Sequence, residues 1–438
     1  MRQDAYPMTA PVDDLLADDL AERVFGLDSF YVHEVEITPI GALFRGAMRR
    51  DAAIVSERVQ RQLRTHADLA EQVQLFLVSD PTSAGSERLS DSEWDDDEEE
   101  LFDPVFLALP ASMQPPAAAA LLPARAGEQS RSATWRLWSA RLSPLACGLL
   151  TTGSSLAFGY ACYAGTGEPD LATQAAPLAG GLLALQAVHE AAHASAARCH
   201  GLQVSPPTLA PCLPTGCFGG HTPLASYPAN RTTLFDFASA GPLVGGACSV
   251  AAAVGGLALT SMAPDEAVAS MPALSYETLH QSFLFSLLNE LALGPPSGLA
   301  SATEVHLHPL AIVGFTGLIS NAVSLLPCGR LDGGRLAVAA YGRQPAAALS
   351  GLCLVVLGLA TLVSDEPQFL SFWALVVMLL FRQPEVPCIN EVSPLDDARS
   401  RLLLPLLACS LLVLLPAPHF VPEYFDQDAL RSMVFPIS

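Results

Sequence analysis

The chain has 438 residues, of which 51% are hydrophobic and 15% are charged. This balance excludes a wholly soluble protein and indicates a polytopic membrane protein that carries a soluble part. The formal net charge is −22, it comes largely from the first hundred residues, and it culminates in the acidic run Asp95 to Glu100. Such a surface argues against nucleic-acid binding.

The N-terminal quarter predicts an acidic tail over residues 1–19 and a small soluble α+β domain over 20–110. Its elements are a strand, a helix with apolar residues at helical spacing, and two buried strands, at Phe30 to Ile37, Ala52 to Arg64, Val73 to Val78 and Val105 to Pro110. The acidic stretch 90–100 is expected to be a solvated loop. An Ala/Pro-rich linker over 111–138 follows.

Residues 139–416 form a series of apolar segments near the ~20 residues that a bilayer needs. We expect about seven spans, near residues 142–163, 176–198, 237–262, 306–328, 346–363, 368–381 and 402–416. Leu279 to Leu293 is shorter and carries Glu290, so an interfacial or re-entrant segment is expected there. Residues 417–438 form a C-terminal tail.

The arginines test this arrangement. With the N-terminal domain on the positive side of the membrane, every arginine from 131 onward except Arg431 falls on that side, as the positive-inside rule expects. The acidic pair Asp265 and Glu266 falls opposite. Seven spans with Leu279 to Leu293 not crossing therefore fit the charges.

The segment Leu182 to Gly201 contains an HExxH array inside an apolar stretch. On a helix His189 and His193 lie one turn apart on one face and can bind one metal ion, while Glu190 can take a proton from a metal-bound water. The array also arises by chance on solvated helices. In an apolar span, however, burying unpaired polar side chains costs on the order of several kcal/mol, and such side chains normally face a functional site.

A catalytic zinc site usually has three protein ligands and an open fourth position. Ten residues after His189 stands Cys199, with His200 one position too late for the soluble pattern. Another acidic residue is Asp332, in LLPCGRLDGGRL, where proline and glycines break a helix next to an apolar span. Asp332 is thus either the third ligand or an acidic residue in an ordinary turn.

HEAAH followed by a distant LDGG resembles the intramembrane site-2 metalloprotease family. The resemblance is closest to the plastid subgroup named for ethylene-dependent gravitropism-deficient, yellow-green plants, and it covers nearly the whole chain beyond residue 20. The motifs that carry it are TGCFGGHT, DFASAGPLVGG, LHQSFL, NAVSLLPCGRLDGGRLAVAAYGR and FGLDSFYV…GALFRGAMR. Ser324 stands where relatives commonly have a second asparagine, while Asn321 is retained.

The resemblance implies a zinc-dependent intramembrane endopeptidase with one Zn²⁺ per chain. It implies the ligands His189, His193 and Asp332, with Glu190 as catalytic acid and base. The substrate would be a transmembrane protein whose helix unwinds. An unwound strand could then pair with the loop from Gly216 to His221 by β-addition, and the substrate-binding residues expected from this are Asn321, Gly216, Phe218 and Gly219.

The resemblance also implies a multi-pass plastid membrane protein in contact with the lipid bilayer, expected in the thylakoid with its soluble domain and active site toward the stroma. Met1 to Asp14 resembles neither a signal nor a transit peptide, so any targeting segment is expected outside this sequence. Two alternatives differ in class: a proteolytically inactive membrane scaffold or chaperone of the same family, and a transporter with broken helices at a polar midplane site. The full His, Glu, His, Asp set argues against the first, and no visible inverted repeat supports the second.

Overall fold

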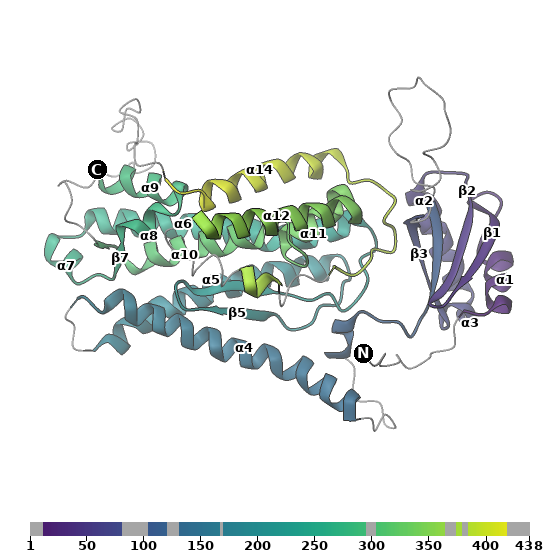
Figure 1. Cartoon of the computed structure of the whole chain (residues 1–438), viewed down its shortest axis with the longest axis horizontal. Helices are drawn as coiled ribbons and strands as arrows, with labels where there is room; N and C mark the ends of the chain where they lie inside the picture. The colour runs from purple at the N-terminus through teal and green to yellow at the C-terminus, as the bar shows by residue number, and fades with distance from the viewer. Residues whose placement is uncertain are drawn as a thin grey trace, which may run out of the picture. The chain divides into compact units, whose positions relative to one another are not determined.

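Figure 1 shows the computed structural model of the chain, which describes residues 12–80, 104–120, 131–166, 170–294, 304–363, 374–378 and 384–417. The chain divides into two compact units. The first comprises residues up to Pro116 with the segments Ala225–Leu234 and Val386–Asp396, and the second comprises the remainder. The predicted acidic loop at 90–100, most of the predicted span at 368–381 and nearly all of the tail at 417–438 lie outside the described residues.

The first unit is built on a four-stranded antiparallel sheet with the strand order β1-β2-β4-β3. Its strands are β1 (Phe30–Thr38), β2 (Gly41–Met48), β3 (Val73–Ser79) and β4 (Pro104–Pro110). The three predicted strands are confirmed, whereas β2 is an element that the sequence pattern does not predict. Arg45 interrupts the apolar run of β2, and in the fold its guanidinium donates to Asp80 at 2.8 Å and to Glu36 at 2.7 Å.

Three helices accompany this sheet, α1 (Asp14–Arg23), α2 (Ala52–Thr65) and α3 (Ala67–Ala70). The predicted helix is confirmed as α2, which starts after Asp51 because that side chain accepts a hydrogen bond from the Ala53 amide at 2.8 Å. Its inner face recurs at intervals of four residues and joins the phenylalanines of the sheet in one buried core, through Val55, Val59 and Leu63.

The segment Val386–Asp396 completes the sheet at its β3 edge. The Leu77 amide donates to the Ile389 carbonyl at 2.8 Å, and the Glu391 amide donates to the Leu77 carbonyl at 2.9 Å. A strand edge that pairs in this way is no longer open to other chains.

The second unit is largely helical. Its longer helices are α4 (Arg131–Tyr163), α5 (Leu171–Cys199), α6 (Arg231–Met262), α10 (Pro309–Ser324), α11 (Asp332–Tyr341), α12 (Arg343–Val363) and α14 (Asp397–Leu414). Among the described residues, four helices are long and apolar enough to cross a membrane, over Ser143–Tyr163, Leu171–Cys199, Arg231–Met262 and Arg343–Leu362. These four overlap the spans predicted near 142–163, 176–198, 237–262 and 346–363.

Other predicted spans differ from the helices found. The span expected at 306–328 is the 16-residue helix α10, which is about 24 Å long at 1.5 Å per residue. The segment Leu279 to Leu293 falls in two short helices, α8 (Tyr276–His280), which ends with the C-cap Gln281, and α9 (Phe283–Leu293), which Ser282 caps by accepting from the Phe285 amide at 3.3 Å. The remaining short elements are α7 (Asp265–Ala269), the pair β7 (Ala273–Ser275) and β8 (Glu304–His306), and η3 (Pro116–Ala120).

Helix α10 lies at the centre of the second unit. Nearly all of its side chains are buried, which is typical of a helix that is apolar all round. It contacts α5, α14 and the hairpin strand β6 (Gly216–His221), which pairs with β5 (Thr208–Cys212). Gly256 of α6 and Gly314 of α10 let the two backbones touch, since a Cβ on either would overlap the other helix.

Candidate metal centre

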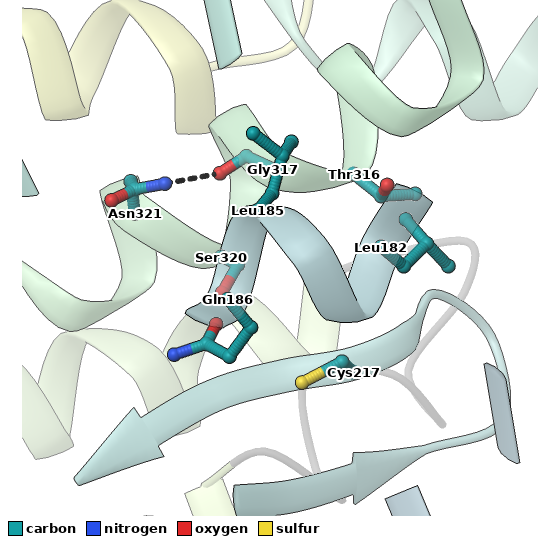
Figure 2. A pocket seen from close by; sticks show the side chains of 8 residues that line it. All are labelled: Leu182, Leu185, Gln186, Cys217, Thr316, Gly317, Ser320 and Asn321. Atoms are coloured by element: carbon teal, nitrogen blue, oxygen red, sulfur yellow. Dashed lines mark hydrogen bonds between the residues drawn. The ribbon is translucent and has the colours of Figure 1, made fainter. Parts of the chain in front are cut away.

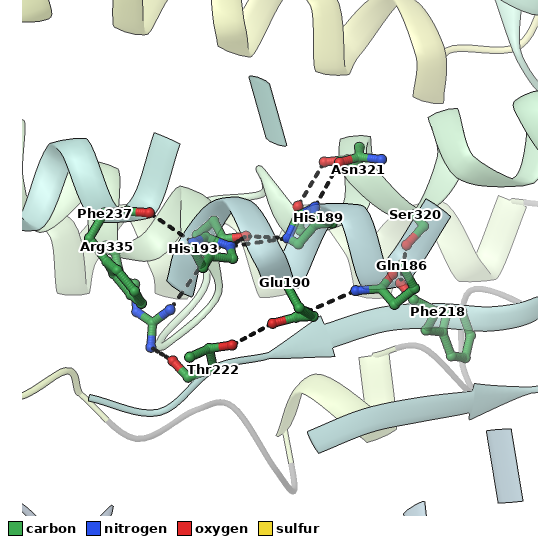
Figure 3. Close-up of polar contacts among 12 residues, drawn as sticks. Gln186, His189, Glu190, His193, Phe218, Thr222, Phe237, Ser320, Asn321 and Arg335 are labelled. Atoms are coloured by element: carbon green, nitrogen blue, oxygen red, sulfur yellow. Dashed lines mark hydrogen bonds and ion pairs between the residues drawn. The ribbon is translucent and has the colours of Figure 1, made fainter. Parts of the chain in front are cut away.

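Helix α5 carries the HExxH residues on its buried face. His189, Glu190 and His193 have exposed fractions of 4%, 8% and 1%. Because the two histidines are one helical turn apart, their Nε2 atoms lie 3.1 Å from each other. The expected pairing of the two imidazoles on one face is therefore found (Figure 3).

Asp332 reaches the same point from the first residue of α11. Its Oδ2 lies 3.4 Å from Nε2 of His189 and 3.4 Å from Nε2 of His193. The turn before it is tight, because Cβ atoms at Gly333 and Gly334 would overlap the carbonyls of Leu325 and Gly329. The two glycines of the LDGG motif thus let α11 fold back against the end of α10 and hold the carboxylate over the histidines.

Each imidazole is oriented through its other nitrogen. Nδ1 of His189 donates to Oδ1 of Asn321 at 2.9 Å, and Nδ1 of His193 donates to the carbonyl of Phe237 at 2.8 Å. Asn321 is fixed in turn, since its Nδ2 donates to the Gly317 carbonyl at 2.8 Å. These bonds leave the Nε2 lone pairs directed at the shared centre, as in metal sites whose ligands are held by a second hydrogen bond.

The donor set fits a metal ion. The ligand atoms of His189, His193 and Asp332 all lie within 4.8 Å of one another. A Cβ at Gly241 of α6 would overlap Nε2 of His193 and come within 2.6 Å of Nε2 of His189, so glycine keeps that space free. Two imidazole nitrogens and one carboxylate oxygen are ligands that zinc takes at about 2.0 to 2.2 Å, and three of them leave a fourth position for water.

Arg335 is a fully buried cation next to Asp332. Its Nη1 lies 3.4 Å from Oδ1 of Asp332, and its Nε donates to Glu385 at 2.6 Å. Its Nη2 donates to the carbonyl of Thr222 at 2.9 Å. A buried guanidinium is stable only when carboxylates and carbonyls satisfy it, so Arg335 joins Asp332 to the residue that follows β6.

Two neutral donors hold the Glu190 carboxylate. Gln186, one turn earlier on α5, donates to Oε1 at 2.9 Å, and the Thr222 hydroxyl donates to Oε2. The hairpin packs directly against this group, because a Cβ at Gly220 would overlap Oε1 of Glu190. Glu190 is therefore fixed beside His189 and His193 by hydrogen bonds to both of its carboxylate oxygens.

The residues expected to bind substrate lie on two elements. Gly216, Phe218 and Gly219 are on β6, where Gly216 and Gly219 have φ values of 78° and 131° that favour glycine. The Phe218 carbonyl accepts from the Ser320 hydroxyl of α10 at 3.0 Å. Asn321 is on α10, where its amide contacts His189.

Several site residues are not predicted from the sequence. Thr222 ends the motif TGCFGGHT, and Arg335 lies in the motif LDGGRL. Gln186 stands four residues before Glu190, so helical spacing predicts that the two side chains lie on one face. Phe237 offers His193 a backbone carbonyl as hydrogen-bond acceptor, for which the sequence has no signal. His200, the other histidine near the array, lies 3.1 Å from Asp236 instead.

Comparisons with known proteins agree with this geometry. Residues 177–364 match the model of Peptidase family M50, and residues 18–115 match that of the EGY3 middle domain. The chain is 29% identical to "Probable zinc metalloprotease EGY2, chloroplastic" of Arabidopsis thaliana over 402 residues, which are 92% of this chain and 65% of the relative.

Two further relatives extend the comparison. The chain is 28% identical to "Probable zinc metalloprotease EGY1, chloroplastic" of Oryza sativa subsp. japonica over 92% of this chain and 68% of that protein. It is 32% identical to "Probable zinc metallopeptidase EGY3, chloroplastic" of Arabidopsis thaliana over 52% of this chain and 41% of that protein. No solved structure matches the chain. The chain spans slightly less than two thirds of the EGY2 relatives that it matches.

The match to Peptidase family M50, a membrane-embedded family, agrees with the four described helices that are long and apolar enough to cross a membrane, and the small N-terminal α+β unit is found as expected. The resemblance to site-2 proteases is confirmed as well: residues 177–364 match the model of Peptidase family M50, and the chain is similar along most of its length to chloroplastic proteins named zinc metalloproteases.

Proposed function

We propose that the chain is a zinc-dependent intramembrane endopeptidase that hydrolyses peptide bonds of membrane-embedded protein substrates. The observation that carries the proposal is the convergence of Nε2 of His189, Nε2 of His193 and an oxygen of Asp332 within 4.8 Å, next to Glu190, whose carboxylate is held by other donors. This is a three-ligand zinc site with a separate base. The names of the relatives as zinc metalloproteases support one Zn²⁺ per chain.

The residues divide the chemistry among them. Zinc held by His189, His193 and Asp332 would supply Lewis-acid activation of a water and of the scissile carbonyl. Glu190 takes the proton from the water on its carboxylate and delivers it to the leaving amine. Asn321 keeps the His189 ring in the tautomer that leaves Nε2 free for the metal.

Arg335 and Thr222 together fix the position of the base Glu190 relative to the third ligand Asp332. Arg335 contacts Asp332 and also donates to the Thr222 carbonyl, while the Thr222 hydroxyl donates to Glu190. A movement of the hairpin end would thus displace the base relative to the metal ligands. We assign both as positioning residues.

The substrate would bind in extended form along β6. The strand has one strand partner, β5, among the described residues, and its Phe218 carbonyl accepts from the Ser320 hydroxyl of α10. A substrate strand that adds here gains backbone hydrogen bonds and lies beside Glu190. Gly216, Phe218 and Gly219 would then face the substrate backbone, with Asn321 at the same site through its contact with His189.

The membrane arrangement is part of the proposal. We propose a membrane domain of seven spans over residues 139–416, joined by the linker 111–138 to the soluble domain 20–110. We also propose that the protein lies in a plastid membrane, the thylakoid, with its soluble domain and active site toward the stroma. The names of the relatives as chloroplastic support the plastid. Apolar side chains of α12 suit contact with lipid, since they are 56% to 81% exposed at Leu352, Val355, Val356, Leu359 and Leu362.

Cleavage of a transmembrane reporter protein by the full chain in lipid vesicles tests this function. We expect the parent to cleave the reporter, to lose the activity on chelation and to regain it with Zn²⁺. Glu190→Gln should be inactive, whereas Glu266→Gln, which changes an exposed carboxylate on α7, should cleave at the parent rate. Absence of cleavage by a zinc-loaded parent would instead support the inactive scaffold.

A further inference from the structure

A pocket opens between α5, α10 and β6 beside the metal centre (Figure 2). It is small, with a cavity volume of about 20 Å³, it is partly open to solvent, and its lining is uncharged: Leu182, Leu185, Gln186, Cys217, Thr316, Gly317, Ser320 and Asn321. None of these side chains is a metal ligand. The pocket is thus a separate feature that the hydrolytic chemistry leaves unexplained.

The pocket lies next to the reacting groups. Gln186 lines it and donates to Glu190 at 2.9 Å, and Asn321 lines it and accepts from His189 at 2.9 Å. Along α5, the pocket residue Leu182, then Gln186, then Glu190 are spaced by four, so they follow one face in steps of about 6 Å. An extended chain advances about 3.4 Å per residue, so a substrate on β6 would place a side chain within one or two residues of the scissile bond at this pocket.

The polar atoms of the lining are already engaged. The Thr316 hydroxyl donates to the Ile312 carbonyl at 2.9 Å, the Ser320 hydroxyl donates to the Phe218 carbonyl at 3.0 Å, and the Asn321 amide donates to the Gly317 carbonyl at 2.8 Å. Burial raises the pKa of the Cys217 thiol to about 12, so the thiol is neutral. A charged side chain would therefore enter without a counter-charge, which is costly at a buried site.

We propose that this pocket receives the side chain of the substrate residue next to the scissile bond and selects a small, uncharged apolar side chain. The inference rests on the proposed protease function. Leu185 of α5 is the wall that limits the size of the guest, since it is a partly buried leucine that also packs toward Gly317. With leucine at position 185, the pocket has room for an alanine or valine side chain of the substrate. A shorter side chain at this position would admit leucine or phenylalanine.

The test uses transmembrane reporters that differ only at the residue next to the cleaved bond, set to Ala, Val, Leu, Phe or Asp, with the bond located by mass spectrometry. We expect the parent to cleave the Ala and Val reporters fastest and the Asp reporter slowest. Leu185→Ala should raise the Phe-to-Ala ratio of kcat/KM by about tenfold, the scale of a few methylenes in a hydrophobic subsite. Leu183→Ala, also partly buried on α5 but outside the pocket, should leave the ratio unchanged.

A second variant covers the case in which Leu185→Ala does not fold. Cys217→Leu fills the pocket from β6 and should lower the rates of the Val and Leu reporters relative to Ala. Equal ratios in the parent, Leu185→Ala and Leu183→Ala, or faster cleavage of the Asp reporter than of the Ala reporter, would overturn the subsite while leaving the protease function standing. Cleavage of no reporter by the zinc-loaded parent would refute the protease function itself.

Discussion

The hydroxyl of Thr222 offers a sharp test of how the base is held. Thr222→Val keeps the shape of the side chain but removes the hydrogen bond that its hydroxyl donates to the Glu190 carboxylate. A hydrogen bond to a charged group contributes about 1.5 to 3 kcal/mol. If this bond orients the base in the transition state, its loss lowers kcat by about 10-fold to 150-fold, with the zinc content unchanged, because Thr222 is not among the proposed metal ligands.

The assay is reporter cleavage at saturating substrate in lipid vesicles, with zinc content and thermal unfolding measured on the same samples. Thr222→Ser keeps the hydroxyl and should recover most of the parent kcat. Thr361→Val is the matched control, because the Thr361 hydroxyl donates only within α12, to the Leu357 carbonyl at 2.9 Å. Parent-like kcat in Thr222→Val, or a loss of zinc equal to the loss of turnover, would refute the reasoning.

Further predictions concern the ligand set, the topology and a buried thiol. Asp332→Ala should lower zinc occupancy as loss of a ligand does, while Asp396→Ala, an exposed carboxylate, should not; full zinc in Asp332→Ala would exclude it as a ligand. In a cysteine-free background, single cysteines at 51 and 396 should label from one side of the membrane and a cysteine at Asp265 from the other, and labelling of 51 and 396 from opposite sides would overturn the seven-span arrangement. Because the pKa of Cys217 is raised to about 12, its thiol should react with maleimide at pH 8 far more slowly than an exposed thiol, and a rate equal to that of a free thiol would contradict its burial.

The metal site is predictable from local sequence because helical spacing alone places His189 and His193 on one face. Asp332 is recognised through the glycines that follow it, whose role in the structure is to let α11 close against the end of α10. What encloses the site is not local. The bonds that orient it join Thr222 to Glu190 across 32 residues and Asn321 to His189 across 132 residues, and no periodicity in the chain encodes such pairs.

The elements of the fold also divide into those that a local sequence pattern predicts and those that depend on contacts distant in the sequence. Strands β1, β3 and β4 and helix α2 are predicted from apolar patterns that each segment carries by itself. Strand β2 is missed because Arg45 breaks its pattern, and the fold accommodates that residue with Glu36 of β1 and with Asp80, 35 residues away. Hydropathy likewise does not give the bounds of α10, whose 16 residues are fewer than the apolar segment 306–328 that contains it.

The most direct test of the whole account is a paired measurement on Glu190→Gln, in which zinc per chain and reporter turnover are determined on one purified sample. Glutamine keeps the size of the side chain and does not disturb the three ligands, but it cannot take a proton from water. The account predicts one zinc per chain, as in the parent, and no cleavage. Turnover equal to that of the parent would contradict the role of Glu190, and loss of zinc would contradict its place outside the ligand set.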